Sequence, residues 1–83
     1  MRKNKLKEIL KSDKPVVCGW LHIPNSWTAD VMANAGWDCL TVDMQHGLCN
    51  IETAIQMMQA ISTTSTVPLA RANWNTPGEI MKL

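Results

Sequence analysis

Three side chains in this 83-residue sequence are of types that can move a proton and bind an anion. Asp43 and His46 lie three residues apart, and Arg71 follows further along the chain. A histidine has an unperturbed pKa near 6.5, so it can act as base or acid close to neutrality. The planar guanidinium of an arginine matches a carboxylate in two-pronged fashion and keeps its charge. Together these groups predict a site for a small anionic substrate with an abstractable proton, in which Asp43 fixes the orientation and tautomer of His46.

Each of these residues also has a purely structural interpretation. An aspartate at the end of a strand often caps a loop, and an arginine there often forms a surface salt bridge. We interpret His22, which follows an apolar run, as a loop residue or as support behind the site. Asp43 and His46 could ligate one metal ion, but a zinc site needs three or four protein ligands. Any metal would therefore need residues from elsewhere.

The polar groups follow apolar runs that are typical of strands. We expect strands at residues 15–21, 39–42 and 67–71. Four helices are expected between and around these strands. The first is a short amphipathic helix containing Leu6, Ile9 and Leu10, and the second begins near Trp27 and ends before Gly36. The third is capped by Asn50, and the fourth starts with the capping box of Thr76, Pro77, Gly78 and Glu79. The stripe of Ile51, Ala54, Ile55, Met58 and Ile61 predicts a helix that lies on a core.

The alternation of strands and helices predicts an α/β fold with a parallel sheet. The near-continuous apolar run in the first strand is typical of a strand covered on both faces, and the connections suit right-handed crossovers. The carboxyl ends of parallel strands face the same side, so Trp20, Asp43, His46 and Arg71 should converge there. Three strands would leave open edges, and no helix stop signal precedes Leu83. We therefore expect residues 1–83 to be the N-terminal part of one longer domain.

Composition excludes several classes of protein. The chain is 46% hydrophobic and 18% charged with a net charge of +1, so no overall field would attract nucleic acid or an anionic membrane. Its three cysteines are an odd number without C-x-x-C spacing, which favours a reducing compartment. No apolar stretch approaches the length of a membrane span, and no signal-peptide core follows the N-terminal lysines. We expect a cytoplasmic protein with neither nucleic-acid nor membrane partners.

The sequence resembles the class II pyruvate aldolases, the metal-dependent hydroxy-oxo-acid aldolases. The resemblance runs end to end in order and spacing, and its motifs are Gly19-Trp20-Leu21, Ala35-Gly36-Trp37-Asp38, Val42-Asp43-Met44-Gln45-His46-Gly47 and Arg71-Ala72-Asn73-Trp74-Asn75. It implies a TIM (β/α)8 barrel of about 250 residues, of which this chain would supply a leading helix and about three βα units.

The resemblance also implies roles for individual residues. His46 would be the catalytic base with Asp43 as its partner, Arg71 would hold the pyruvate carboxylate and stabilise the enolate, and Trp20 would form a pocket wall. Gln45, a further expected substrate contact, stands where many family members have glutamate. The implied reaction is cleavage of a 4-hydroxy-2-oxo acid to pyruvate and an aldehyde, or the reverse.

The implied cofactor is a divalent metal, Mg²⁺, Mn²⁺ or Co²⁺, held by a glutamate and an aspartate of later strands that this chain does not contain. The resemblance further implies a homo-oligomer, and we expect the 83 residues alone to be inactive. An alternative hypothesis is a non-catalytic α/β interaction module of 83 residues, whose open sheet edges would be covered by copies of itself or by another chain.

Overall fold

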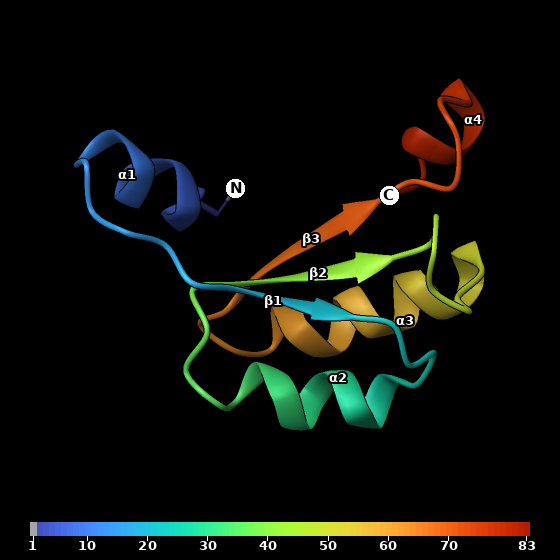
Figure 1. Cartoon of the computed structure of the whole chain (residues 1–83), viewed down its shortest axis with the longest axis horizontal. Coiled ribbons are helices and arrows are strands. Elements are labelled where there is room, and N and C mark those ends of the chain that lie inside the picture. The colour runs from blue at the N-terminus through green and yellow to red at the C-terminus, as the bar shows by residue number, and fades with distance from the viewer. Residues whose placement is uncertain (1) are drawn as a thin grey trace.

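The computed structural model describes residues 2–83 as a parallel sheet with helices packed on one face (Figure 1). The elements in chain order are α1 (Lys5–Lys11), β1 (Cys18–Leu21), α2 (Ser26–Ala33), β2 (Cys39–Asp43), α3 (Ile51–Ser62), β3 (Val67–Arg71) and α4 (Pro77–Ile80). The strand order is β1-β2-β3, and both neighbouring pairs are parallel. The predicted α/β class and the three parallel strands are confirmed.

The core lies between the sheet and the two helices beneath it in Figure 1, α2 and α3. The central strand β2 buries all five of its residues. The main contributors to the core are Leu40, Val42, Ala29, Ala33, Ala54, Met57 and Ile61. Burial of apolar surface is the dominant favourable term in folding, so the fully buried β2 is the most strongly stabilised of the three strands. Residues at the end of β2 are therefore positioned by a rigid part of the fold.

Short polar side chains fix where the two long helices begin. The side chain of Asn25 accepts a hydrogen bond from Thr28 N–H at 3.1 Å, and that of Asn50 accepts one from Thr53 N–H at 2.9 Å. These bonds satisfy amides that have no partner within the helix, and the cap predicted at Asn50 is confirmed. The predicted capping box at α4 is wrong, because Thr76 makes no side-chain cap hydrogen bond.

The first strand is shorter than expected. It begins at Cys18 rather than at residue 15, because Val17 N–H donates to the Asp38 carboxylate at 2.9 Å instead of joining a strand ladder. Only one face of the sheet is covered by helices among the described residues, and Trp20 on the other face is 49% exposed. In a (β/α)8 barrel that second face points to the interior, so the arrangement is that of consecutive βα units of such a barrel.

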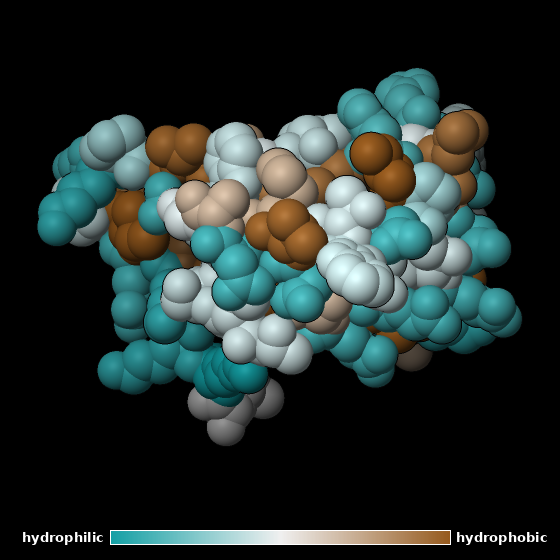
Figure 2. Space-filling model, turned by 90° about the horizontal axis from the view of Figure 1, so that it is seen from below, coloured by the Kyte–Doolittle hydropathy of each residue, from teal (hydrophilic) through white to brown (hydrophobic). Residues whose placement is uncertain are grey.

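The outer surface of the helices is of mixed character. Figure 2 shows this side of the molecule, on which small hydrophobic areas alternate with hydrophilic ones. Trp27 and Val31, one turn apart on α2, are among the exposed apolar side chains. Across residues 2–83, every helix is too short or too polar to cross a membrane.

Candidate active site

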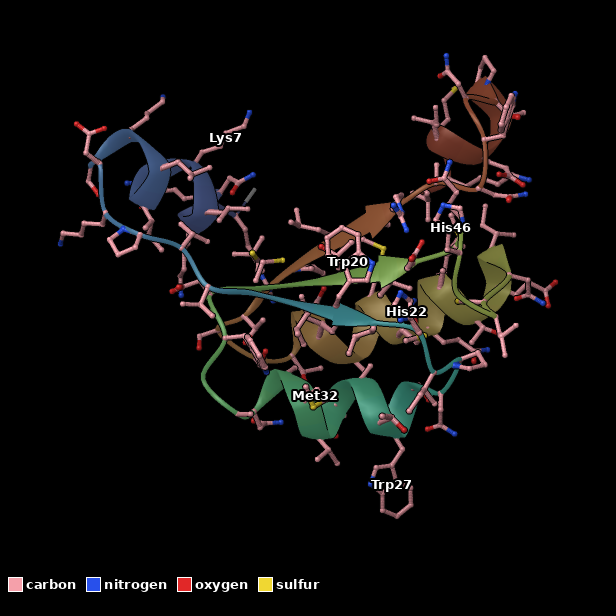
Figure 3. All side chains as sticks on the ribbon, in the orientation of Figure 1. Lys7, Trp20, His22, Trp27, Met32 and His46 are labelled. Carbon is pink, nitrogen blue, oxygen red and sulfur yellow. The ribbon has the colours of Figure 1, made fainter. Side chains whose placement is uncertain are left out.

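The predicted site residues meet at the carboxyl ends of the strands. Asp43 and Arg71 are the last residues of β2 and β3 and are direct partners in the strand register. Trp20 lies next to them on β1, and Figure 3 shows its ring above the sheet, on the face opposite α2 and α3. This edge of the sheet, at the carboxyl ends of the three strands, is called the carboxyl rim below. It brings together an aspartate, an arginine and an aromatic ring, one from each strand.

Asp43 and Arg71 form a two-pronged ion pair. Arg71 Nε donates to Asp43 Oδ1 at 3.0 Å, and Arg71 Nη2 donates to Oδ2 at 2.6 Å. Asp43 is completely buried, which by itself would raise its pKa. The bonds from Arg71 outweigh burial and hold the pKa of Asp43 well below its usual range, while Asp43 raises the pKa of Arg71. The carboxylate is thus ionised at any working pH.

Trp20 holds both members of this pair. Its indole Nε1–H donates to Asp43 Oδ2 at 3.1 Å. Its ring centroid lies 5.2 Å from Arg71 Cζ, within the range of a cation–π interaction. Trp20, which was expected to form a pocket wall, thus helps to fix the orientation of the Arg71 guanidinium.

The loop after β2 is folded tightly against Asp43. The backbone N–H groups of Gln45 and His46 donate to Asp43 Oδ1 at 2.9 and 3.2 Å. A Cβ atom at Gly47 would lie only 2.1 Å from the carbonyl oxygen of Asp43, so only glycine fits there without movement of the loop. The amides point inward as a result, and the side chains of Gln45 and His46 are exposed.

The histidine that Asp43 orients is not the one the sequence suggested. Among the described residues, Asp43 bonds to His46 only through the backbone, because the loop turns the imidazole outward (Figure 3). The Nε2 atom of His22 instead lies 3.0 Å from Asp43 Oδ2. The signal missed in the sequence is the two-residue spacing from Trp20 to His22, because alternate residues of a strand lie on the same face.

Arg71, which was expected to bind a substrate carboxylate, has one side of its planar fork already occupied. The edge formed by Nε and Nη2 is bonded to Asp43. The remaining edge, formed by Nη1 and the second hydrogen of Nη2, points away from Asp43, and the side chain is 37% exposed. A hollow of about 390 Å³ adjoins it, lined by Gln45, Arg71, Ala72, Trp74, Asn75 and Ile80. This volume suits a small molecule.

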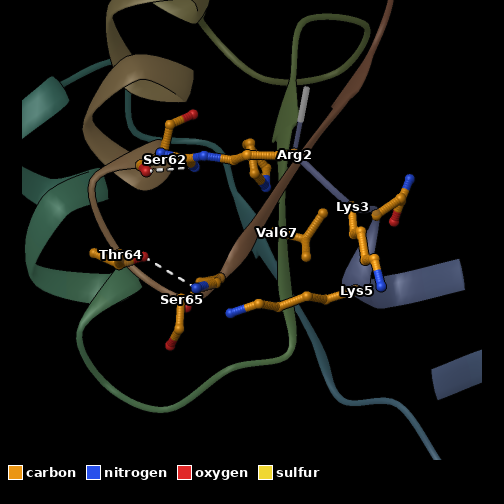
Figure 4. A pocket seen from close by; sticks show the side chains of 10 residues that line it. Arg2, Lys3, Lys5, Ser62, Thr64, Ser65 and Val67 are labelled. Carbon is orange, nitrogen blue, oxygen red and sulfur yellow. Dashed lines mark hydrogen bonds between the residues drawn. The ribbon is translucent and has the colours of Figure 1, made fainter. Parts of the chain in front are cut away.

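A larger hollow of about 550 Å³ lies at the other end of the sheet (Figure 4). Its lining includes Arg2, Lys3 and Lys5 beside residues 62 and 64–68. Arg2 Nη1 is bonded to the Ser62 carbonyl oxygen at 2.8 Å. This hollow opens at the amino ends of the strands, the side of a barrel that serves stability rather than catalysis, so its size does not make it the candidate active site.

The described residues do not form a metal site by themselves. Within residues 2–83, no group of three or more His, Cys, Asp or Glu side chains lies close enough together to hold an ion. Both oxygens of Asp43 accept hydrogen bonds from several donors, one of them a cation, so they are poorly placed to bind a second cation. A metal would require ligands from outside these described residues.

Comparison with known proteins decides the family. The 4-hydroxy-2-oxo-heptane-1,7-dioate aldolase of Salmonella dublin is 37% identical to the chain over 81 residues, which are 98% of the chain and 31% of the relative. A crystal structure of an HpcH/HpaI aldolase/citrate lyase family protein from Burkholderia cenocepacia matches 96% of the chain and 32% of its own length, with 26% identity and a TM-score of 0.88. The chain belongs to the HpcH/HpaI aldolase family. The predicted resemblance to class II pyruvate aldolases and the TIM-barrel assignment are thereby confirmed.

Other findings set the scope of this membership. The citrate synthase SbnG also matches, with 26% identity, a TM-score of 0.82 and coverage of 93% of the chain and 31% of SbnG. No protein-family model matches the sequence. The chain spans about a third of the length of the curated relatives it matches. The chain is thus similar to proteins named for different carbon–carbon bond reactions, and the substrate is not fixed by these similarities alone.

Proposed function

We propose that the chain is part of a class II aldolase that cleaves a 4-hydroxy-2-oxo acid to pyruvate and an aldehyde, or catalyses the reverse addition. The observation that carries this proposal is the Asp43–Arg71 ion pair at the carboxyl rim, which presents the outer edge of a cation beside a hollow of about 390 Å³. The names of the curated relatives support the same reaction class.

Arg71 would bind the carboxylate of the oxo acid. Its outer edge offers two N–H donors that can form charge-assisted hydrogen bonds with one or both carboxylate oxygens. Asp43 and Trp20 hold the guanidinium in place from the other side, so little reorganisation is needed when substrate arrives. The same positive charge would stabilise the enolate that develops as the carbon–carbon bond breaks.

His46 would act as the base. Its imidazole is exposed on the loop that Asp43 holds, and it can accept the proton of the 4-hydroxyl group. The bond between carbons 3 and 4 then breaks, and an aldehyde and the enolate of pyruvate result. Gln45, which lines the hollow next to Arg71, would contribute a neutral hydrogen-bonding amide to substrate binding.

The rest of the site would come from outside these residues. Residues 1–83 would form the first βα units of one barrel domain, whose remaining strands cover the open sheet edges. A divalent metal, on which class II aldolases of this family generally depend, would be held by those later strands. The groups that recognise the aldehyde and the surfaces that form a homo-oligomer would lie there as well.

The proposal is tested by measuring pyruvate release from a 4-hydroxy-2-oxo acid, with and without manganese. The 83-residue chain is assayed beside the complete reading frame that encodes it. We expect metal-dependent release only from the longer protein. Absence of activity in both, with a folded short chain, would favour the non-catalytic interaction module instead.

The role of His46 is tested in the longer protein. His46→Ala should lower the rate of cleavage by about 10²-fold or more, the usual contribution of a general base. Gln56→Ala, an exposed position on α3 away from the rim, is the control and should leave the rate unchanged. Near-normal turnover in His46→Ala would remove His46 from the role of base.

A further inference from the structure

The proposed reaction needs two proton transfers, and His46 accounts for only one of them. Cleavage removes a proton from the 4-hydroxyl group and must then deliver a proton to carbon 3 of the enolate to give pyruvate. The sequence contains two histidines, and Figure 3 shows both at the carboxyl rim, His22 after β1 and His46 after β2. His22 is therefore a candidate for the second transfer, and any such role rests on the proposed aldolase function.

The structure fixes the tautomer of His22. The ionised carboxylate of Asp43 can only accept hydrogen bonds, so the Nε2 atom that lies 3.0 Å from Oδ2 must carry the hydrogen. In the neutral ring, Nδ1 then has no proton and presents its lone pair. The side chain is 58% exposed, and the edge of the ring that faces away from Asp43 carries this nitrogen. A base whose other ring nitrogen is held by a buried carboxylate is the arrangement used in many acid–base sites.

Asp43 has no structural need of His22. Its Oδ2 already accepts bonds from Arg71 and Trp20, and its Oδ1 from Arg71 and two backbone amides. The sixth bond, from an exposed imidazole, adds little to an anchored carboxylate, but it is the one side-chain hydrogen bond that the structure gives to His22 within residues 2–83. Asp43 therefore orients His22 more than His22 orients Asp43.

The position of His22 suits carbon 3 of a bound oxo acid. Its Nε2 and the Nη2 of Arg71 bond to the same carboxylate oxygen, so the two nitrogens lie within two hydrogen-bond lengths of one another. Pyruvate bound by its carboxylate to the outer edge of Arg71 has its methyl carbon only two bonds from that carboxylate carbon. His22 bonds to the charged Asp43 of β2, and the same oxygen accepts bonds from the charged Arg71 of β3 and from the indole N–H of Trp20 on β1.

We propose that His22 is a second catalytic acid–base residue, which transfers the proton at carbon 3. In cleavage, His22 acts in its imidazolium form, having taken a proton from solvent on Nδ1: the electron pair of the enolate takes that proton, the new C3–H bond forms as the Nδ1–H bond breaks, the carbonyl of pyruvate is restored, and His22 is left as the neutral Nε2–H tautomer. In the direction of addition, Nδ1 removes a methyl proton of pyruvate. His46 would serve the hydroxyl oxygen and His22 the neighbouring carbon.

Exchange of the pyruvate methyl protons with D₂O isolates this step, because it needs no aldehyde and no 4-hydroxyl group. The exchange is followed by proton NMR in the complete protein for the wild type, His22→Gln, His22→Ala and the Gln56→Ala control. Glutamine keeps an N–H that can reach Asp43 but cannot carry a proton to carbon. Both His22 variants should exchange about 10²-fold more slowly than the wild type, with Gln56→Ala unchanged.

The outcomes separate the possible failures. Wild-type exchange in His22→Gln, with or without a loss in His22→Ala, would overturn the catalytic role. A wild type that neither cleaves nor exchanges would overturn the proposed aldolase function itself and this role with it. As a readout independent of turnover, ¹⁵N shifts of the His22 ring should show the Nε2–H tautomer, and an Nδ1–H tautomer would contradict the assignment.

Discussion

Replacing Asp43 by asparagine removes the charge of the site with almost no change in shape. Each oxygen of Asp43 accepts three hydrogen bonds: Oδ1 from Arg71 and two backbone amides, and Oδ2 from Arg71, Trp20 and His22. The amide nitrogen of asparagine must replace one oxygen, and the fixed backbone amides leave it the Oδ2 position. There it would face three donors, of which His22 alone can become an acceptor by changing its tautomer.

The size of the effect follows from the contacts that remain. Two donor–donor contacts at a buried position cost about 1 to 3 kcal/mol each, and removing one partner of a buried ion pair costs about 3 to 5 kcal/mol. Arg71 is 37% exposed, so water can satisfy part of its lost bonding. We therefore expect the lower end, a loss of about 3 kcal/mol in the free energy of unfolding.

Chemical denaturation of the complete protein measures this loss. Asp38→Asn is the matched control, because the single bond that Asp38 accepts, from Val17 N–H at 2.9 Å, can also be accepted by an asparagine carbonyl. The control should lose less than about 1 kcal/mol. If Asp43→Asn is no less stable than Asp38→Asn, Asp43 is not the charged centre of the rim and the reasoning fails.

Three further predictions concern acid, the loop and the guanidinium. Arg71 holds the pKa of Asp43 well below the value of about 3.9 that an aspartate has in an unfolded chain. The contribution of ionised Asp43 to the stability of the fold is therefore complete above about pH 4 and is lost as the pH falls further. Asp43→Asn should reduce the slope of stability against pH in this acid range by up to about 1.4 kcal/mol per pH unit, as measured by denaturation at several acid pH values. The new Cβ of Gly47→Ala would overlap the Asp43 carbonyl oxygen, so this variant should lower the rate of pyruvate formation by at least about tenfold. Gly78→Ala is the control and should leave the rate unchanged, because its new Cβ would meet no atom within 4 Å. Equal rates in the two variants would show that the loop geometry is not needed. Arg71→Lys keeps the charge but loses the fork, and should raise the KM for the oxo acid by about tenfold or more in steady-state kinetics; an unchanged KM would remove Arg71 from substrate binding.

The order of elements could be predicted from the sequence because local signals set it. The polar caps Asn25 and Asn50 mark helix starts, and the apolar run ending at Asp43 marks a buried strand. The late start of the first strand was not predictable, since it depends on the side chain of Asp38, which approaches Val17 only in the folded chain.

The site was predictable in its location but not in its pairings. Parallel strands bring their carboxyl ends together, so the convergence of Asp43 and Arg71 followed from the fold class. Which histidine bonds to Asp43 depends on how the loop turns at Gly47, and the spacing of Asp43 and His46 does not encode that turn. Side chains alternate between the two faces of a strand, so extending this alternation from Trp20 to His22 would have placed both side chains on the same face of the sheet.

The direct pairing of Asp43 with Arg71 across neighbouring strands also specifies how β2 and β3 align. A slip of one residue would turn every side chain of one strand to the opposite face, which would take Arg71 away and leave a buried carboxylate without its cation. Misaligned pairings are therefore penalised by the same charges that are proposed to bind substrate. Substitutions at this rim should therefore yield misfolded chains as well as inactive ones. New substrate specificities are more easily acquired in the loops, where a substitution does not affect the alignment of the strands.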